Sequence, residues 1–428
     1  MPNVFVLAHD AFNRRALDTV ERASDYRFHP LLSYEQVKRR HHGVIDELLD
    51  RASHELEHFE RSGRGSVDGI VGFWDFPVQT MVAILRRRRS LPGPTLESVM
   101  KCEHKYWSRL EQQEAIPEQI PAFAVFDPFD DDPSIGLELP CWIKPIKSTA
   151  SELCFLVSDE GELQHALDTI RARIDRFGVS FGQLMAHADL PDEIAAVSGH
   201  HCIAEGVMQG EQHTLTGYVY GGAVEVYGVV DSLNYPGTSS FSRYQYPSRL
   251  PDDVQARMGE SAARVIDRVG FDHEAFNVEF FYDRAADALS LLEVNPRMSQ
   301  SHGPLFDKVD GSPDHRIVAD LAVGRRPDFP RRQGPFACAA KCYLRQFGDA
   351  VVTRAPDAET VARVEREVPG SMIDLKVSEG TRLSQMAGQD AYSFALAHIY
   401  VAGDSEDDLT DAYERCVVGL GIELEVRA

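Results

Sequence analysis

Two short apolar runs joined by a polar turn, in the segment FNVEFFYDRAADALSLLEVNPR at 276–297, constrain the fold more than any other feature. Alternation with a period of two is typical of strands with one buried and one exposed face. It puts Glu279 on the polar face of the first run, and Glu293 and Asn295 on the polar face of the second. If the chain turns near Ala286, Glu279 and Glu293 face each other across an antiparallel hairpin, with side-chain bases about 5 Å apart.

Two facing carboxylates repel each other, and a hard divalent cation relieves that repulsion. Carboxylate and amide oxygens are ligands that Mg2+ accepts while it keeps positions for water and phosphate. Glu279, Glu293 and Asn295 are therefore the candidate ligands for Mg2+ or Mn2+. Arg297, two residues further along, can meet an anion beside the metal. The alternative is an ordinary hairpin with a wet acidic face, in which the two acids never approach each other.

Length and composition indicate a soluble protein with two or three domains. The chain has 428 residues, of which 43% are hydrophobic, enough for sizeable cores. No apolar run approaches the ~18 residues of a membrane span, and the apolar run at the N-terminus is too short for a signal sequence, so we expect a cytoplasmic protein. The formal charge of -23 argues against nucleic acid and anionic membranes as partners. Seven cysteines without a CxxC pair predict reduced thiols.

Three other features of the sequence allow different interpretations. HELEH at 54–58 matches the H-E-x-x-H pattern of zinc metallopeptidases. The apolar stripe of its helix leaves His54 and His58 roughly 200° away on the wet face, and no third ligand follows, so we expect no zinc site. The first strand lacks G-x-G-x-x-G, which disfavours a dinucleotide-binding enzyme. The four arginines at 86–89 are expected to form a solvated last helical turn.

With LLEVNPR preceded by VEFFYD, the chain resembles the ATP-grasp superfamily. The resemblance implies a mixed α/β and α+β fold with three parts. An open α/β domain is expected at 1–95 and a C-terminal α/β cap at 331–428. Between them, a nucleotide-binding unit at 96–330 would comprise two subdomains, about 96–202 and 203–330. Proline- and glycine-rich segments mark both expected boundaries.

The same resemblance assigns phosphate-binding residues upstream of the hairpin. Lys105 in CEHKYW and Lys144 in CWIKP lie where the family places its two nucleotide lysines. A lysine on an apolar strand needs a partner, which favours Lys144, whereas Lys105 lies on a charged helix and has a solvated side chain as its alternative. KSTASEL replaces the glycine-rich loop of the family, and its small residues, Ser151 among them, still permit close approach of phosphate to the backbone.

The segment HHCIAEGVMQGEQHTL resembles the adenine hinge of the family. The resemblance implies that Glu205 accepts a hydrogen bond from the adenine amino group and that the backbone at Met208 meets a ring nitrogen. Glu211 or Gln212 would hold the ribose hydroxyls. The expected cofactors are therefore ATP and Mg2+ or Mn2+.

A further cation is expected near the terminal phosphate. No lysine occurs between Lys147 and Lys308, so the candidates are Arg243 and Arg249 in the loop at 232–250. A guanidinium offers a planar, permanently charged fork for phosphate. The alternative is that both arginines are ordinary surface residues.

The resemblance implies an ATP-dependent carboxylate-amine ligase that forms an amide or peptide bond. The γ-phosphate would move to the substrate carboxylate, and an amine would attack the acylphosphate while Arg297 stabilises the developing charge, releasing ADP and phosphate. Small carboxylates and amines, amino acids among them, are the expected substrates. Residues 299–302 and the loop at 232–250 are the nearest polar candidates to contact them. A homodimer is compatible with this class. Two alternatives stay open: biotin carboxylase-like carboxylation, and a regulatory ATP-binding module without turnover.

Overall fold

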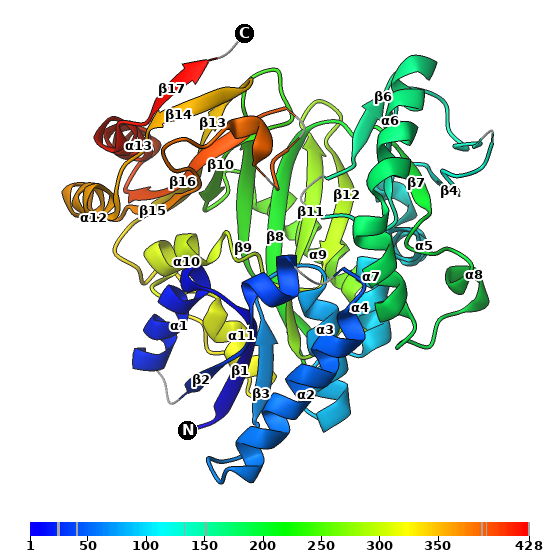
Figure 1. Ribbon diagram of the computed structural model, residues 1–428, viewed down its shortest axis with the longest axis horizontal. Helices are drawn as coiled ribbons and strands as arrows, with labels where there is room; N and C mark the ends of the chain where they lie inside the picture. The colour runs from blue at the N-terminus through cyan, green and yellow to red at the C-terminus, as the bar shows by residue number, and fades with distance from the viewer. Residues whose placement is uncertain are drawn as a thin grey trace.

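The structure is a computed structural model, which describes residues 1–23, 26–39, 42–131, 133–149, 152–386, 388–390 and 392–426. Its strands form four sheets of three, eight, two and four strands. The eight-stranded sheet runs through the middle of the molecule, with the N-terminal elements below it and the C-terminal elements at the upper left (Figure 1). Among these residues no helix is both long and apolar enough to cross a membrane.

The N-terminal part is a small parallel sheet of order β2-β1-β3 covered by helices. β1 lies in the middle of this sheet and pairs in parallel with β2 and with β3. The elements are β1 (Asn3–His9), α1 (Ala11–Ala23), β2 (Arg27–Ser33), η1 (Glu35–Arg39), α2 (Ile45–Arg61), β3 (Gly69–Gly72) and α3 (Val78–Arg89).

An antiparallel four-stranded sheet of order β4-β7-β5-β6 follows, at the right of Figure 1. Two helices lead into it, and a cap residue starts each: Thr95 accepts from the amide of Ser98, and His104 from that of Trp107. The elements are α4 (Leu96–Glu103), α5 (Lys105–Ala115), η2 (Pro117–Gln119), β4 (Phe123–Phe126), β5 (Cys141–Pro145), β6 (Phe155–Val157), α6 (Glu160–Arg173), α7 (Asp175–Met185), α8 (Asp192–Ala195) and β7 (Cys202–Gly206).

The large sheet has the order β12-β11-β8-β9-β10-β13-β16-β15. Because β10 pairs with β13, strands from beyond residue 330 extend the sheet that carries the acidic hairpin. The predicted domain boundaries themselves stay predictions. The elements are β8 (Glu211–Tyr220), β9 (Ala223–Asn234), β10 (Phe241–Tyr246), α9 (Asp252–Val269), β11 (Glu274–Asp283), β12 (Ala288–Asn295), α10 (Gly303–Asp310), α11 (His315–Ala322), β13 (Cys338–Gln346), β14 (Ala350–Arg354), α12 (Ala358–Glu367), β15 (Met372–Leu375), η3 (Leu383–Gln385), β16 (Phe394–Gly403), α13 (Glu406–Leu420) and β17 (Glu423–Val426).

The predicted hairpin is confirmed, and Glu279 pairs directly with Glu293. The route to this register differs from the prediction. Asp283 pairs with Ala288, so a regular ladder would bring Glu279 opposite Leu292. A β-bulge on the second strand of the hairpin leaves Leu292 as the extra residue. Leu292 is therefore only half-buried, and Glu293 pairs with Glu279.

The arginine run at 86–89 corrects one prediction, because its first member is not solvated. Arg86 is only 1% exposed. Its guanidinium forms an ion pair with Glu274 on β11 at 2.6 Å and donates to the carbonyl of Ile70 on β3 at 2.6 Å. The last turn of α3 therefore joins the N-terminal sheet to the large sheet, while Arg87 and Arg88 remain exposed.

Loss of the Arg86 ion pair should destabilise the whole chain. We expect Arg86→Ala to lower the free energy of unfolding by about 3–5 kcal/mol, because it leaves the Glu274 carboxylate buried without its cation. Arg88→Ala, on the exposed side of the same helical turn, should change it by no more than ~0.5 kcal/mol. Urea unfolding followed by circular dichroism measures both, and equal effects of the two variants would contradict this role.

Candidate nucleotide and metal site

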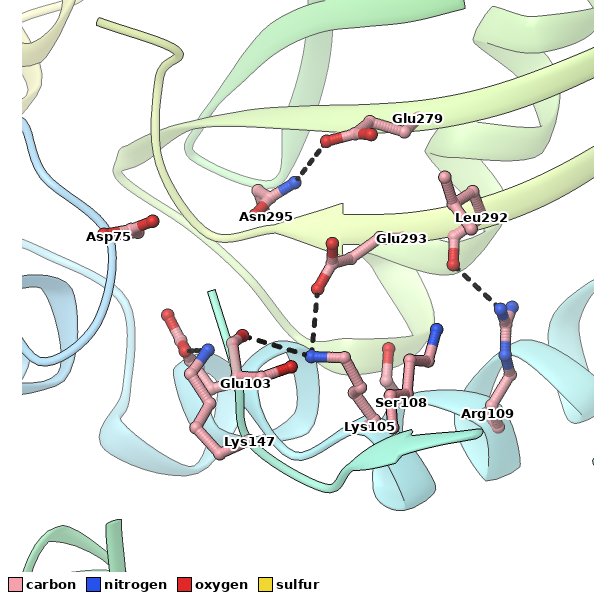
Figure 2. Close-up of polar contacts among 12 residues, drawn as sticks. Asp75, Glu103, Lys105, Ser108, Arg109, Lys147, Glu279, Leu292, Glu293 and Asn295 are labelled. Atoms are coloured by element: carbon pink, nitrogen blue, oxygen red, sulfur yellow. Dashed lines mark hydrogen bonds and ion pairs between the residues drawn. The ribbon is translucent and has the colours of Figure 1, made fainter. Parts of the chain in front are cut away.

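The two facing carboxylates lie on one face of the large sheet, and amide side chains donate to one of them, Glu279. Gln212 on β8 donates to Glu279 Oε2 at 2.7 Å, and Asn295 donates to Glu279 Oε1 at 3.2 Å. Asn295 also donates to Asn277 Oδ1 at 3.1 Å across the hairpin. Figure 2 shows Glu279, Asn295 and Glu293 lying on adjacent strands above a group of basic side chains.

The pKa values of the two carboxyl groups reflect their burial and their mutual repulsion. Burial and the neighbouring Glu293 raise the pKa of Glu279 to about 7, against the lowering effect of Arg297. Burial also opposes the charge of Glu293, but Lys105 and Lys144 lower the pKa of that carboxyl below its usual value. Burial and repulsion thus favour the protonated form of Glu279, the lysines favour the charged form of Glu293, and a divalent cation would favour the charged form of both.

The ligand set fits Mg2+ rather than a cage made wholly of protein. Within the described part of the chain, no three His, Cys, Asp or Glu side chains are grouped so that they could hold a metal ion. Mg2+ is usually bound through one or two carboxylates together with waters and substrate phosphates. Glu279, Glu293 and the Asn295 amide match that pattern, and their role as metal ligands stays a prediction.

Basic side chains lie below the acids, at the start of α5 and around β5. Lys105 is only 9% exposed, and its Nζ lies 3.5 Å from Glu293 Oε1 and 3.4 Å from the carbonyl oxygen of Ser148. Its alternative as a solvated side chain is therefore wrong. Lys147, which the sequence did not single out, forms a buried ion pair with Glu103 on α4 beside it (Figure 2).

Glu205 and Lys144 form a buried network with an arginine that sequence reasoning missed. Lys144 Nζ lies 2.6 Å from Glu205 Oε2, and Arg109 Nε lies 2.8 Å from Glu205 Oε1. Burial opposes the charge of Glu205, but these two cations lower its pKa to about 2. Both carboxylate oxygens thus already have partners, and the predicted contact with adenine stays a prediction.

Arg109 also fixes the bulge that brings the two acids into register. Its terminal nitrogens donate to the carbonyls of Leu291 at 2.9 Å and Leu292 at 2.8 Å (Figure 2). A spacing of four residues puts Arg109 on the same helix face as Lys105, and this is the signal by which the sequence could have revealed it.

Arg297 contacts an acid from the N-terminal part of the chain, which the sequence did not predict. Its guanidinium lies 3.8 Å from Asp75, between β3 and α3, and donates to the carbonyl of Met298 at 3.1 Å. Lys38 forms a second ion pair with Asp75. Burial opposes the charge of Asp75, but Lys38 and Arg297 lower its pKa to about 2. Arg297 therefore lies where the first sheet meets the acidic hairpin.

The predicted adenine hinge connects the two larger sheets. Met208 lies between the end of β7 and the start of β8. Gly210 is necessary there, since it has φ +109° and a Cβ would come within 2.3 Å of the Tyr282 carbonyl oxygen. Glu211 is exposed and pairs with Arg284 at 3.0 Å. The predicted Ser151 lies outside the described residues.

The two loop arginines are not beside the acids. Tyr244 pairs with Ser232, which pairs with Gln212, so these side chains share the sheet face of Glu279. Because successive side chains of a strand alternate between faces, Arg243 points to the opposite face. Arg249 lies 2.9 Å from Glu406 and is 52% exposed. Arg243 is half-buried on β10, whereas Arg249 is exposed, and their contact with a terminal phosphate stays a prediction.

The HELEH segment lies on α2, far in the fold from the acidic hairpin. Its helix buries the predicted stripe, Ile45, Leu48, Leu49, Ala52, Leu56 and Phe59. His54 and His58 are exposed on the opposite side, as predicted.

Comparisons with known proteins agree with this geometry. Residues 137–303 match the family model of the ATP-grasp domain. The carbamoyl phosphate synthase large chain of Thermotoga neapolitana is 38% identical over 79 residues, which are 18% of this chain and 7% of that protein. The chain thus corresponds to only a small part of the curated relatives that it matches.

Solved structures cover nearly the whole chain. The L-amino acid ligase from Bacillus licheniformis has a TM-score of 0.74 and 15% identity, covering 100% of this chain and 99% of that one. Biotin carboxylase from Campylobacter jejuni has a TM-score of 0.63 and 13% identity, covering 98% and 92%. An N5-carboxyaminoimidazole synthase from Aspergillus clavatus, solved with ADP, has a TM-score of 0.64 and 11% identity, covering 97% and 98%. The chain contains an ATP-grasp domain, and its predicted fold class is confirmed.

The raised pKa of Glu279 predicts an unusual dependence of stability on pH. In metal-free protein, the folded state keeps a proton on Glu279 that the unfolded state releases, so the free energy of unfolding should fall as pH rises from 4.5 to about 7. Glu279→Gln should remove on the order of 1–3 kcal/mol of that fall. Thermal unfolding in a chelator across this range measures it.

Mg2+ should reverse the effect, because it binds the ionised pair. It should therefore raise the Tm of the wild type more at about pH 8 than at about pH 5, and hardly at all in Glu279→Gln. Glu211→Gln, which changes an exposed acid on the neighbouring strand, is the matched control. An unchanged pH slope in Glu279→Gln would contradict the repulsion between the two acids.

Proposed function

We propose that the chain is an ATP-dependent carboxylate-amine ligase, which forms an amide or peptide bond and releases ADP and phosphate. The observation that carries the proposal is the Glu279–Glu293 pair, which lies above buried lysines from α5 and the end of β5. Transfer of a phosphoryl group mainly requires positioning and stabilisation of charge. The facing acids would position a metal ion, and the lysines would stabilise the negative charge of the phosphate.

The residues of the site divide between metal and nucleotide. Glu279, Glu293 and Asn295 would hold Mg2+, which would neutralise the charge that develops on the phosphate oxygens. Lys105 and Lys144 would neutralise further phosphate charge. The Met208 backbone, Glu205 and Glu211, which lie along the link between the two larger sheets, would contact the adenosine.

Arg297 would act on the acyl group. The γ-phosphate moves to the substrate carboxylate, and the amine then attacks the acylphosphate carbonyl carbon. A guanidinium close to the acids can stabilise charge that is present only during these steps. Its ion pair with Asp75 fixes the position of the guanidinium at the edge of the site.

Amino acids are the first substrates to test. The chain is similar over its whole length to a solved L-amino acid ligase, although that likeness shows the fold alone. A cytoplasmic location and a homodimer accord with this class and stay part of the proposal. Purified protein should be screened with single amino acids and pairs for stimulated release of ADP.

The metal pair gives the first functional prediction. Glu293→Gln should lower the rate of ADP release at saturating ATP at least 100-fold, because it removes a charged ligand at the site of phosphoryl transfer. Its circular dichroism spectrum should not change. Glu260→Gln, which alters an exposed acid on α9, should keep the wild-type rate. Normal turnover and metal dependence in Glu293→Gln would disprove the metal site.

The phosphate-binding lysines give a second prediction. Lys144→Ala should weaken ATP binding at least 10-fold, since a buried cation beside Glu205 is lost. His58→Ala, on the exposed face of α2, should bind ATP like the wild type. Isothermal titration calorimetry measures both. Stoichiometric zinc that is lost from His58→Ala together with activity would instead revive the metallopeptidase alternative.

The reaction class is tested by its products and by a trap. Hydroxylamine in place of the amine should give a hydroxamate while ADP and phosphate accumulate. Arg297→Ala should slow that formation more than it weakens ATP binding. If AMP and pyrophosphate form, or if ATP is consumed only with bicarbonate and biotin, the ligase proposal is wrong. Nucleotide binding without any turnover would support the regulatory module.

A further inference from the structure

A lysine from the C-terminal part of the chain lies in a cage of aromatic rings on the large sheet. Lys341 on β13 pairs with Tyr244 on β10 and with Tyr400 on β16, so the three side chains share one face. Its Nζ lies 5.8 Å from the Tyr244 ring, 4.6 Å from the Tyr343 ring and 5.8 Å from the Tyr400 ring. The residue is 3% exposed, and its Nζ donates to Ser301 Oγ at 2.8 Å.

No acid compensates this ammonium. Within the described residues no ion pair joins Lys341 to a carboxylate, and the nearby Asp374 is engaged by Lys376 at 2.5 Å and by His398 at 3.7 Å. Burial lowers the pKa of Lys341 to about 7. The positive charges of Lys376 and Arg345 also lower this pKa, whereas the negative charge of Asp374 raises it. A large fraction of Lys341 is therefore a neutral amine near neutral pH, able to accept a proton.

The cage borders the proposed reaction site. In the paired strands, Lys341 lies in the same cross-strand row as Gln212, which donates to Glu279. Ser301 is partly exposed and follows Arg297 by four residues. His302, the residue after Ser301, is buried, and its ring lies 5.2 Å from that of Tyr244 in the cage. The Ser301 hydroxyl therefore lies beside the caged lysine, on the segment that follows Arg297 along the chain.

We propose that Ser301 and Lys341 form a relay that removes a proton from the amine substrate. The proposal rests on the ligase function above and adds that the nucleophile is an amine that is protonated in water, such as the α-amino group of an amino acid. Such an ammonium has no lone pair with which to attack. It must lose a proton inside the site, and a neutral lysine behind a hydroxyl can accept that proton.

The protons and electron pairs balance as follows. The substrate ammonium gives one proton to Ser301 Oγ while the hydroxyl proton of Ser301 passes to the neutral Lys341. The freed lone pair attacks the acylphosphate carbonyl carbon, and the bond from that carbon to the phosphate oxygen breaks, so phosphate leaves with the electron pair. The second proton of the new amide nitrogen goes to the phosphate. Lys341 then returns its proton to water.

The test compares two nucleophiles on the same variants. Hydroxylamine is a weak base that is largely unprotonated at neutral pH, so it needs no relay. Lys341→Met and Lys341→Arg should both lose roughly 100-fold or more of the rate with the best amino acid pair from the screen. Both should keep the rate of hydroxamate formation within about 3-fold of the wild type. Lys101→Met, which changes a lysine on α4 outside the site, should keep both rates.

The Lys341→Arg variant distinguishes a role of Lys341 in proton transfer from a role as a fixed positive charge. Because arginine stays protonated, recovery of the amino acid rate in Lys341→Arg would overturn the relay and make Lys341 an anion-binding residue. Equal losses with both nucleophiles would also overturn it. A wild type that forms no hydroxamate and releases no ADP would instead overturn the ligase function itself, so the two failures are distinguishable.

A measurement on the wild type does not depend on how the variants fold. The chain has eight lysines, so the side-chain signals of 13C-labelled lysine can be resolved by NMR. Lys341 should titrate near pH 7, and the rate with the amino acid pair should rise with pH through the same range while the hydroxylamine rate does not. Titration of Lys341 with an ordinary lysine pKa of about 10 would overturn the relay.

Discussion

The repulsion between Glu279 and Glu293 is the constraint on which the rest of the site depends. Paired strands hold the two carboxylates opposite each other, and burial together with Glu293 raises the pKa of Glu279 to about 7. A chain without a cation to bind at this point would gain from an apolar pair there. The surrounding lysines lower the pKa of Glu293, while that of Glu279 stays raised, and they would attract an anion such as a nucleotide phosphate beside a bound cation.

A second network keeps this pair in register across three elements. The buried Arg109 joins Glu205 on β7 to the bulge at Leu292 on β12, so the smaller sheet and the acidic hairpin cannot move independently without exposing unpaired charge. Lys144 completes the network from β5. On the other side, the Arg86–Glu274 ion pair joins α3 and the N-terminal sheet to β11. Buried ion pairs and hydrogen bonds therefore connect the acidic hairpin to both neighbouring sheets, an arrangement that suits electrostatic preorganisation.

The sequence predicted features that depend on residues close together in the chain, such as the acidic hairpin. Strand alternation and a short turn were enough to pair Glu279 with Glu293, although LSLLEV gave no sign that a bulge at Leu292 would set the register. Prediction from the sequence missed contacts between segments that are far apart in the chain, such as Arg109 with Glu205 or Asp75 with Arg297. The spacing of residues along the chain carries no information about which helices and strands come into contact. The arginine run misled for the same reason, since the burial of its first member depends on a strand nearly two hundred residues away.

A crystal structure with Mn2+ and a non-hydrolysable ATP analogue tests the central claim most directly. The anomalous scattering of Mn2+ locates the ion without reference to any assumed ligand. We expect an anomalous peak between the Glu279 and Glu293 carboxylates, in contact with phosphate oxygens of the nucleotide and next to Lys105. A nucleotide bound with its metal elsewhere, or an analogue seated at this surface with no ion between the two carboxylates, would contradict it.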